Sequence, residues 1–406
     1  MHVSEGNKMI KATKKQKILL VHNYYKVSGG EDTVVENEKA LLEKNGHEVF
    51  FYSRANKEMD DFGVVRKLLL PFTTIFQLKT YKDIKKIIRE EGIDIVHVHN
   101  TLNLISPSVY YAALHCKVPV VQTVHNFRLI CPGATFFREG KVCEECMQHG
   151  LGCSIKHKCY RGSRLQTIAC VVTTKLHRML GIYHKIHYIC LTEFNRKKIL
   201  EVNAREKKEV FDPEKMFVKP NMTFQTMQKP VVSRGDYYLF AGRVEPLKGI
   251  DILIGAFKML PQEKLLIAGN GPDLEHYKKM AKDENADNIE FLGFQKKEDL
   301  QPMIQKAKAL ILSTQCYEGF PMTVVEAFSL GTPVIGSDLG NTGSLIQEGV
   351  NGWKFRHDSP EALAEKIRVC SETPYEQLRI VCDESILPEG NYKELIKIYN
   401  CIEEHK

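Results

Sequence analysis

The sequence predicts an α/β protein with two doubly wound domains. Short runs rich in Val, Ile and Leu alternate with amphipathic stretches along most of the 406 residues, a pattern typical of βα units on parallel sheets. The alternation stops near Pro220 and starts again at residue 237, after a polar stretch. Because this length corresponds to two or three domains, we expect one domain over 17–220, one over 221–385, and a central cleft between them as the ligand site.

The first domain begins with a strand, a glycine-rich loop and a helix. Residues 17–25 (KILLVHNYY) are mostly apolar and predict the strand. Gly29 and Gly30 follow in the loop VSGGED, and residues 33–47 carry apolar side chains at helical spacing. Three more apolar runs predict further strands, over 47–53, 93–100 and 118–127.

The rest of the first half is less regular. We expect an irregular, Cys-rich insertion over 131–162, a helix over 163–181, and a strand followed by a helix over 187–201. The polar and basic residues 1–16 predict a flexible tail. The amphipathic stretch 386–406 predicts a C-terminal helix that packs back on the first domain.

The second domain repeats the βα pattern. Its apolar runs predict strands over 237–244, 264–272, 288–294, 308–314 and 332–338. Helices are predicted over 249–260 and 322–330. In open sheets of this kind, ligands bind at the carboxyl ends of the strands, so the loops that follow these strands are the candidate site.

Composition excludes several classes of protein. With 43% hydrophobic and 26% charged residues, the chain has the composition of a globular protein. It contains no apolar run of about 18 residues, which a membrane-spanning helix needs. Residues 1–17 lack the apolar segment of a secretory signal, so we expect a cytoplasmic protein.

The net charge of +7 is concentrated in one segment. Residues 156–200 hold ten Lys or Arg and one Glu, which gives +9 and leaves −2 for the rest. Apolar residues of the predicted helix accompany these cations. The combination suits the anionic inner face of the plasma membrane or a phosphorylated partner, and equally a solvated basic face around a core helix.

Four of the twelve cysteines lie close together in the insertion, at Cys143, Cys146, Cys153 and Cys159. A CxxC pair with two further thiols can close a tetrahedral site for a structural zinc ion, with His149 or His157 in place of one thiol. Reduced thiols in a compact loop are the alternative. We therefore treat the four cysteines as a candidate zinc site.

The most informative residues follow strands of the second half. The run EGFPMTVVE places Glu318 on a loop and Glu326 about one turn into a helix whose first free N–H groups, at residues 322–324, favour an anion such as a diphosphate. A carboxylate at Glu326 can accept both hydroxyls of a ribose, and Glu318 can meet hydroxyls of a sugar. Upstream, Arg243 and Lys248 lie at a strand-to-helix turn, where two cations can bind the oxygens of a leaving phosphate.

Together these motifs resemble those of a known enzyme family. The segments GRVEPLKGIDILIGAF, AGNGP, FLGF, EGFPMTVVEAFSLGTPVIGSD and EGVNGWKF are similar to the nucleotide-binding half of glycosyltransferase family 4, the group 1 type with the two-domain GT-B fold. The start KILLVHNYYKVSGGED resembles the acceptor-domain start, and HNFRLICPG with a Cys-rich insertion resembles a subset that acts in surface-polysaccharide assembly. The resemblance covers about residues 17 to 370.

The resemblance implies roles for individual residues. Arg243 and Lys248 would bind the donor diphosphate, Glu326 the ribose and Glu318 the donor sugar, while Phe294 would meet the base. Backbone groups of the loop and helix start would hold sugar and phosphate, at Phe320, Pro321, Met322, Thr323 and Val324. Gly29 and Gly30 would let the first-domain loop approach the phosphates, since any side chain there would clash.

The first half would contribute the acceptor side. His125 matches the cleft histidine of the family, near the sugar and the acceptor. Asn126 and Arg128 lie beside it and are candidates for acceptor binding, as is His99 at the end of an earlier strand. A histidine that satisfies its hydrogen bonds in the core is the alternative for each of the two His.

The implied reaction is transfer of a sugar from a UDP-, GDP- or dTDP-sugar with retention of configuration. Two cations and a helix N-terminus would stabilise the leaving diphosphate, and no Asp-x-Asp motif follows a predicted strand, so we expect no catalytic metal or other cofactor. The family suggests a glycan or lipid-linked glycan acceptor in bacterial capsule, exopolysaccharide or O-antigen synthesis.

Three alternative hypotheses compete with this one. A GT-B enzyme could act on a soluble small acceptor, as disaccharide and sugar-phosphate synthases do. A zinc-containing nucleic-acid-binding module would need aromatic residues interleaved with the cations, and 156–200 offers few, so we expect no nucleic-acid partner. The loop NYYKVSGGED departs from the G-x-G-x-x-G fingerprint of dinucleotide-binding oxidoreductases.

Overall fold

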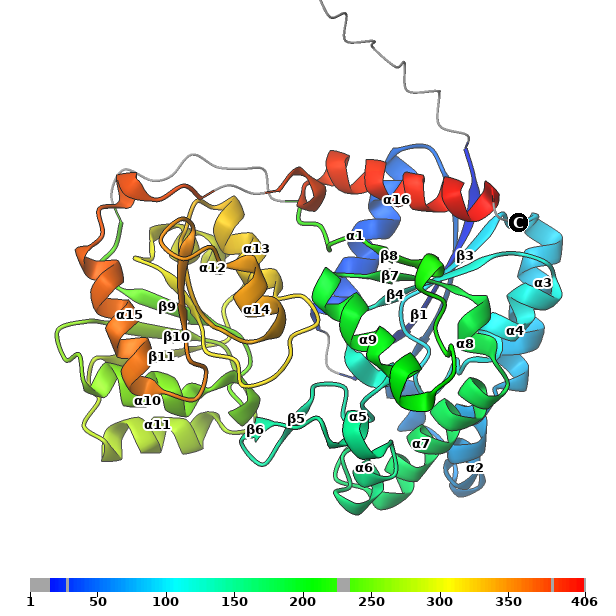
Figure 1. The fold of residues 1–406 in the computed structure, drawn as a ribbon, viewed down its shortest axis with the longest axis horizontal. Helices are drawn as coiled ribbons and strands as arrows, with labels where there is room; N and C mark the ends of the chain where they lie inside the picture. Colours follow the sequence, from blue (N-terminus) through cyan, green and yellow to red (C-terminus); the bar gives the residue numbers. More distant parts are fainter. Residues whose placement is uncertain (1–14, 27–28, 225–233, 381–382, 405–406) are drawn as a thin grey trace, which may run out of the picture. The chain divides into compact units, whose positions relative to one another are not determined.

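The computed structural model describes residues 15–26, 29–224, 234–380 and 383–404. Within them the chain forms two six-stranded sheets, a two-stranded hairpin and the helices labelled in Figure 1. It divides into two compact units, one that runs to Gln122 and resumes at Tyr392, and one over Thr123–Asn391. The predicted fold class, α/β with two doubly wound sheets, is confirmed. The predicted domain limits near residue 220 stay a prediction.

The first unit is built from alternating strands and helices. Its elements are β1 (Lys17–Tyr24), α1 (Gly30–Lys44), β2 (Glu48–Ala55), α2 (Val64–Ile75), α3 (Leu78–Glu91), β3 (Ile95–Val98), α4 (Ser108–His115), the start of β4 (Val120–Val124) and most of α16 (Pro388–Glu404). Ile18 to Val21 are completely buried, as expected for a central strand with both faces covered.

The first sheet has the strand order β2-β1-β3-β4-β7-β8. Strand β1 pairs in parallel with β2 on one side and β3 on the other, with Lys17 opposite Glu48 and Ile18 opposite Ile95. The order reverses between β1 and β3, so the loops that follow these two strands diverge at their carboxyl ends. Those loops carry Gly29 and His99.

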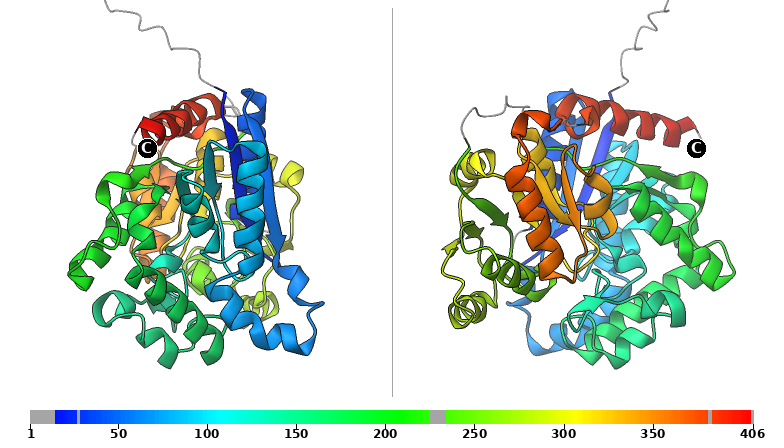
Figure 2. Two further views of the ribbon diagram at one scale, coloured as in Figure 1. Left: turned by 90° about the vertical axis from the view of Figure 1, so that its right-hand side faces the viewer. Right: turned by 60° about the vertical axis from the view of Figure 1, so that its left-hand side comes forward.

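Two buried tyrosines fix α16 to the first unit. The hydroxyl of Tyr392 lies 2.8 Å from Nε2 of His47, and the hydroxyl of Tyr399 lies 2.7 Å from Nδ1 of His97. The two tyrosines are seven residues apart, which places them on one face of the helix, drawn red in Figures 1 and 2.

The second unit begins with the end of β4 and the Cys-rich segment. This part contains the short helix η2 (Phe127–Leu129), the hairpin strands β5 (Phe137–Arg138) and β6 (Lys141–Val142), and the helices α5 (Glu145–His149) and α6 (Cys153–Lys156). There follow α7 (Arg164–Met179), α8 (Ile182–Lys185), β7 (His187–Cys190), α9 (Glu193–Glu206), η3 (Pro213–Lys215) and β8 (Met216–Val218).

The second sheet lies wholly in this unit and has the order β11-β10-β9-β12-β13-β14. Its strands are β9 (Tyr238–Ala241), β10 (Leu265–Ala268), β11 (Ile289–Gly293), β12 (Leu310–Leu312), β13 (Val334–Ser337) and β14 (Gly352–Phe355). The helices between and after them are η4 (Pro246–Lys248), α10 (Ile250–Lys258), α11 (Leu274–Asp283), α12 (Lys297–Lys306), α13 (Met322–Ser329), α14 (Gly340–Leu345) and α15 (Pro360–Glu372). Strands β9 and β12 are neighbours at the point where the strand order reverses.

Side chains of each strand alternate between two hydrophobic layers. Tyr238 and Phe240 of β9 pack with apolar residues of α10, α11 and α15. Leu239 and Ala241 pack with residues of α12 and α13 on the other face. This period of two buries both faces of the sheet and leaves the strand ends as the exposed part.

Several elements were missing from the sequence prediction, namely α2, α3, α4, α11, α12, α14, α15, β8 and β14. The missed helices α3 and α11 are mainly polar on their outer faces, and the missed strand β8 has only three residues. None of these three elements therefore gives a long apolar pattern in the sequence. No helix in the described parts of the chain has the length and apolar character that crossing a membrane requires.

Candidate active site

The turn between β9 and α10 carries Arg243 and Lys248. Gly249 ends this turn with φ of +66°, in the left-handed region that favours glycine. A Cβ atom at Gly249 would lie 2.1 Å from the carbonyl oxygen of Ser313, which follows β12. The glycine therefore lets the turn pack directly against the end of β12 and brings Lys248 beside it.

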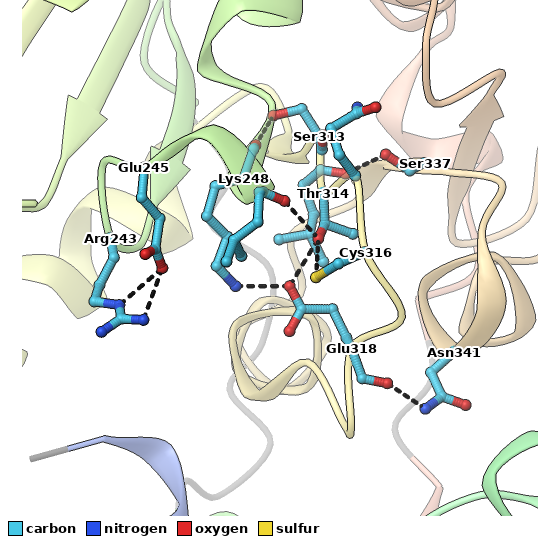
Figure 3. A network of polar contacts seen from close by, with 12 residues as sticks. Arg243, Glu245, Lys248, Ser313, Thr314, Cys316, Glu318, Ser337 and Asn341 are labelled. Atoms are coloured by element: carbon cyan, nitrogen blue, oxygen red, sulfur yellow. Dashed lines mark hydrogen bonds and ion pairs between the residues drawn. The ribbon is translucent and has the colours of Figure 1, made fainter. Parts of the chain in front are cut away.

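Lys248 pairs with Glu318 at this junction (Figure 3). Nζ of Lys248 lies 2.6 Å from Oε1 of Glu318, which also accepts a hydrogen bond from Oγ1 of Thr314 at 2.9 Å. Their side chains are 20% and 17% exposed, so both groups keep a limited path to solvent. A cation and a carboxylate meet at the point where the strand order of the sheet reverses.

The ion pair sets the charge state of both groups. Burial alone would raise the pKa of Glu318, but the Lys248 ammonium and the Thr314 hydroxyl bring it below its usual range. Burial would lower the pKa of Lys248, but Glu318 brings it above its usual range. The site therefore holds one positive and one negative charge at neutral pH.

Arg243 offers a second cation with a different environment. Its Nε donates to Oε1 of Glu245 at 2.9 Å, and the guanidinium side chain is 64% exposed. Figure 3 shows Arg243 and Glu245 beside the Lys248 turn. An exposed guanidinium retains N–H donors for a phosphate.

The loop after Glu318 is held from two sides. A Cβ atom at Gly319 would lie 1.9 Å from the carbonyl oxygen of His125, so the two backbones approach more closely than any side chain would allow. The amides of Asn195 and Asn341 donate to the Gly319 carbonyl at 2.8 and 2.7 Å, and Asn341 also donates to the Glu318 carbonyl at 2.6 Å. Both amides are buried, and these contacts fix the loop beside His125.

Helix α13 begins directly after this loop, with Pro321 as its N-cap. Its first turn contains no acidic residue, so the positive end of the helix dipole is not neutralised there. The Val324 N–H donates to the Pro321 carbonyl at 3.0 Å and its side chain lies in the core. The expectation of a free N–H at Val324 is therefore wrong, whereas Phe320, Met322 and Thr323 are partly exposed.

Two further predicted donor contacts lie on this unit. Burial raises the pKa of Glu326, which is partly exposed on α13. Phe294 follows β11 and is 71% exposed. The ring is available for stacking.

Tyr317 links the Cys-rich insertion to the loop and was missed in the sequence. Its hydroxyl donates to Oε1 of Glu144 at 2.7 Å, its N–H donates to the Thr135 carbonyl at 3.3 Å, and Lys198 donates to the same Glu144 oxygen at 2.9 Å. Aromatic rings surround it, with centroids 5.1 to 6.2 Å away, from Phe127, Phe136 and Phe194. The insertion therefore supports the residue next to Glu318.

The missed residues had signals of different strength. Thr314 and Asn341 follow strands β12 and β13, and polar residues at strand ends are a recognisable signal of a site. Tyr317, Glu144 and Asn195 act through contacts between distant segments, which no local pattern reveals.

The other predicted acceptor residues have structural partners. The side chain of Asn126 accepts from the Arg128 N–H at 3.1 Å and so caps the short helix η2. Arg128 donates to the Pro132 carbonyl at 3.2 Å and lies over the Tyr160 ring. His125 is partly exposed at the end of β4. The catalytic role of His125 and acceptor binding by Asn126 and Arg128 stay predictions.

In the first unit, the two glycines and His99 have different surroundings. No described atom lies within 4 Å of a Cβ built at Gly29 or Gly30, so packing does not require glycine there and open space remains. His99 is buried, lies 3.3 Å from Glu38 and stacks on His97. Burial lowers the pKa of His99 to about 4, so it is neutral at physiological pH. Its burial favours the core alternative over acceptor binding.

The predicted zinc site is not supported. Among the described residues, the groups whose ligand atoms all lie within 4.8 Å of one another are Glu38-His97-His99 and His184-Glu209-Asp212, and neither includes Cys143, Cys146, Cys153 or Cys159. All four are free thiols, and Cys146 packs with Leu151 and Val171. Burial raises the pKa of Cys146 to about 12 and that of Cys159 to about 11.

Comparison with known proteins gives a consistent result over most of the chain. A model of Glycosyltransferase Family 4 matches residues 28–141, and a model of Glycosyl transferases group 1 matches residues 223–382. An uncharacterized glycosyltransferase of Methanocaldococcus jannaschii is 25% identical over 357 residues, which cover 86% of this chain and 87% of that protein. The alpha-monoglucosyldiacylglycerol synthase of Streptococcus pneumoniae is 23% identical over 371 residues, covering 86% and 77%.

A solved structure shares the fold. HepE of Anabaena in complex with UDP and glucose superposes with a TM-score of 0.58 at 16% identity, over 96% of this chain and 99% of that chain. The group 1 match includes the whole second sheet with Arg243, Lys248, Glu318 and Glu326, and the family 4 match includes β2, β3 and β4 of the first sheet. The chain therefore belongs to glycosyltransferase family 4, and it is a retaining, metal-independent glycosyltransferase of the GT-B fold that uses a nucleotide-sugar donor.

Proposed function

We propose that Lys248, Arg243 and the N-terminus of α13 bind the diphosphate of the donor, and that Glu318 and Glu326 bind the sugar and the ribose. The observation that carries this is the Lys248–Glu318 pair, at the strand-order reversal where doubly wound sheets bind their ligands. Phe294 stacks on the base, and Gly29 and Gly30 leave room for the phosphates. UDP is the first donor nucleotide to test, since HepE was crystallised with it.

In the proposed reaction, the bond between the anomeric carbon and the diphosphate oxygen breaks, and the diphosphate leaves with the electron pair. The two cations and the helix N-terminus stabilise the growing negative charge. The acceptor hydroxyl bonds to the anomeric carbon on the same face, and its proton passes to the leaving phosphate. His125 lies near the sugar and the acceptor in this scheme.

The donor assignment is tested by thermal shift with UDP, GDP, dTDP, ADP and CMP. A ligand at about 100 times its Kd adds about 2.7 kcal/mol of stability, which raises the Tm by several degrees. We expect one nucleoside diphosphate to shift the wild type and Lys248→Ala to lose that shift. Lys264→Ala is the matched control, because Lys264 forms an exposed ion pair with Glu290 before β10. Equal shifts in Lys248→Ala and wild type would contradict the assignment.

We further propose a glycan or lipid-linked glycan acceptor, in bacterial capsule, exopolysaccharide or O-antigen synthesis at the inner face of the plasma membrane. One support is the similarity to a synthase that by its name makes a glycolipid. The other is the surface of residues 156–200, where seven cations are exposed: Lys156, Lys158, Arg161, Arg164, Lys175, Lys185 and Lys197. Leu165 and Met179 are exposed on α7 in the same segment.

Not every cation of this segment contributes to the surface. Arg178 is buried and pairs with Glu206, and Lys198 pairs with Glu144 and Glu201. Charge reversal is therefore confined to Arg161, Arg164 and Lys175. Reduced binding to anionic liposomes at low salt is the expected result, and unchanged binding would remove this segment from the membrane contact.

A further inference from the structure

Helix α2 of the first unit exposes an apolar surface that the transferase site does not use. Of the seventeen large apolar side chains that are exposed among the described residues, five lie within nine positions of this helix and are 49% to 75% exposed: Val64, Val65, Leu68, Leu69 and Phe72. Scattered exposed apolar residues are normal, whereas a continuous group of this size marks an interaction surface. Figure 1 labels the helix, and Figure 2 shows it in blue at the lower edge of the left view.

The five residues form one stripe. Val64, Leu68 and Phe72 are spaced by four residues, and Val65 and Leu69 form the adjacent row, so all five lie on neighbouring ridges of the helix. The opposite side attaches the helix to its unit, since Leu70 packs against Met59, Phe62 and Leu104, and Thr74 is buried. The stripe is therefore the outer face of an anchored helix, not a core face.

The charges around the stripe indicate its partner. Between Val64 and Lys82 the chain has four cations and no acid. Arg66 and Lys67 are exposed beside the stripe, and Lys79 and Lys82 are exposed on α3. Of the three acids just before the helix, Glu58 pairs with Arg54, Asp60 pairs with Lys26, and Asp61 is exposed. An apolar face flanked by cations matches the acyl and headgroup layers of an anionic bilayer.

A second copy of the chain is a poorer match for the same surface. In a two-fold dimer the same patch faces itself, so the exposed Arg66 and Lys67 of two molecules would be brought together. Repulsion between these cations would oppose the apolar contact, whereas anionic lipid would favour it.

We propose that α2 docks this protein on anionic lipid bilayers, with the stripe from Val64 to Phe72 inserted at the boundary between headgroups and acyl chains. Lipid binding by α2 does not require the function proposed above, but its purpose, to bring the enzyme to a lipid-linked acceptor, rests on that proposal. The contact combines insertion of apolar side chains with attraction between Arg66, Lys67 and lipid headgroups.

The experiment uses the full chain and vesicles of one part phosphatidylglycerol to three parts phosphatidylcholine. Insertion predicts that part of the binding survives about 1 M NaCl, where the Debye length is about 3 Å and electrostatic attraction is screened. Leu68→Glu with Phe72→Glu should remove this salt-resistant part and lower the partition coefficient roughly tenfold or more. Met259→Glu with Val369→Glu is the control, because these apolar residues are exposed at the end of α10 and on α15.

A spectroscopic arm reports insertion directly. The chain has one tryptophan, Trp353, which is buried in the second sheet. Phe72→Trp should show a blue-shifted emission on vesicles and quenching by brominated lipid, while Trp353 in the wild type should show neither. No quenching at position 72, together with unchanged binding of the Leu68→Glu, Phe72→Glu protein, would overturn the proposal.

Two readouts separate the alternatives. A concentration-dependent dimer that the two glutamates dissolve, without vesicle binding, would assign the stripe to a second copy and overturn the proposal. The nucleotide-induced thermal shift of the Leu68→Glu, Phe72→Glu protein should equal that of the wild type. If this variant keeps the nucleotide-induced thermal shift but no longer binds vesicles, the result supports docking by α2. If neither the wild type nor the variant shows a thermal shift, the result counts against the donor-site assignment and leaves the docking proposal unaffected.

Discussion

Nζ of Lys248 and Oε1 of Glu318 are 2.6 Å apart although seventy residues separate them in sequence. One residue follows β9 and the other follows β12, the two strands between which the order of the sheet reverses. The pair therefore joins the two loops that flank the proposed donor site, and it fixes the carboxylate and the ammonium relative to one another.

Glu318→Gln should be destabilised in a pH-dependent way. The pKa of Glu318 is lowered in the folded state. Its contribution to the free energy of unfolding is therefore present above its unfolded-state pKa and is lost as pH falls through its folded-state pKa. We expect a loss of about 1–3 kcal/mol near neutral pH, because the variant leaves the Lys248 ammonium without its carboxylate. Urea unfolding at about pH 7 and about pH 4 measures this, and the difference from wild type should shrink at the lower pH. A constant difference would contradict the ion pair.

The raised pKa of Lys248 sets the upper end of the pH range in which the ion pair stabilises the fold. The contribution of Lys248 to the free energy of unfolding is fully present below its unfolded-state pKa and is lost as pH rises through its folded-state pKa. The wild type should therefore hold its advantage over Glu318→Gln between about pH 5 and about pH 10.

Two glycine substitutions should distinguish a glycine that backbone packing requires from one that leaves space for a ligand. Gly319→Ala places a Cβ 1.9 Å from the His125 carbonyl oxygen, so the loop must move, and we expect a lower Tm and a kcat reduced roughly a hundredfold. Gly30→Ala meets no described atom within 4 Å, so its Tm should match that of the wild type. Its proposed position beside the phosphates predicts weaker nucleotide binding. Equal Tm values for both variants would contradict the close approach at Gly319.

The Cys-rich insertion should be coupled energetically to the loop that carries Glu318, through the contact between Tyr317 and Glu144. A double-mutant cycle with Tyr317→Phe and Glu144→Gln should give a coupling energy of about 1 kcal/mol in unfolding. Tyr317→Phe should also lower kcat, since it loosens the residue next to Glu318. Tyr237→Phe is the control, because its hydroxyl donates to the Met303 carbonyl at 2.9 Å before β9. Additive effects in the cycle would argue against the link.

Phe294→Ala should weaken donor binding without affecting folding. The ring is 71% exposed, so its removal leaves no cavity. Stacking of an aromatic ring on a base is worth about 1–3 kcal/mol, which predicts a KM for the donor raised roughly tenfold. Phe294→Tyr keeps the ring and should retain the wild-type KM. An unchanged KM in Phe294→Ala would remove Phe294 from the donor site.

The sequence was sufficient for the fold class because its strands are buried on both faces and read as apolar runs. It also singled out Arg243, Lys248 and Glu318 after strands and Glu326 on α13 as candidate site residues, because they lie in segments with family motifs. Helix α2 was not predicted although its apolar side chains are at helical spacing, because Pro71 in its interior is a residue that usually ends a helix.

What the sequence missed or misjudged depends on contacts between distant segments. The four cysteines have zinc-like spacing, yet among the described residues their thiols do not form a group within 4.8 Å of one another, and Cys146 and Cys153 pack in a hydrophobic cluster. Asn341 and Asn195 are 146 residues apart, and only the folded chain brings both amides to the Gly319 carbonyl. His99 ends a strand as a site residue would, but Glu38 on α1 pairs with it in the core.

The attachment of α16 has a consequence for biosynthesis. Tyr399 closes over His97, which emerges from the ribosome 302 residues earlier. At about 5–20 residues per second, the nascent first sheet waits roughly 15–60 s before the helix that covers it is made. During that time His47, His97 and Glu38 are open to water, so the first unit to be synthesised is among the last to be completed. Its maturation on the ribosome is therefore governed by translation speed, and chaperone dependence should increase when translation is slowed between β4 and α16.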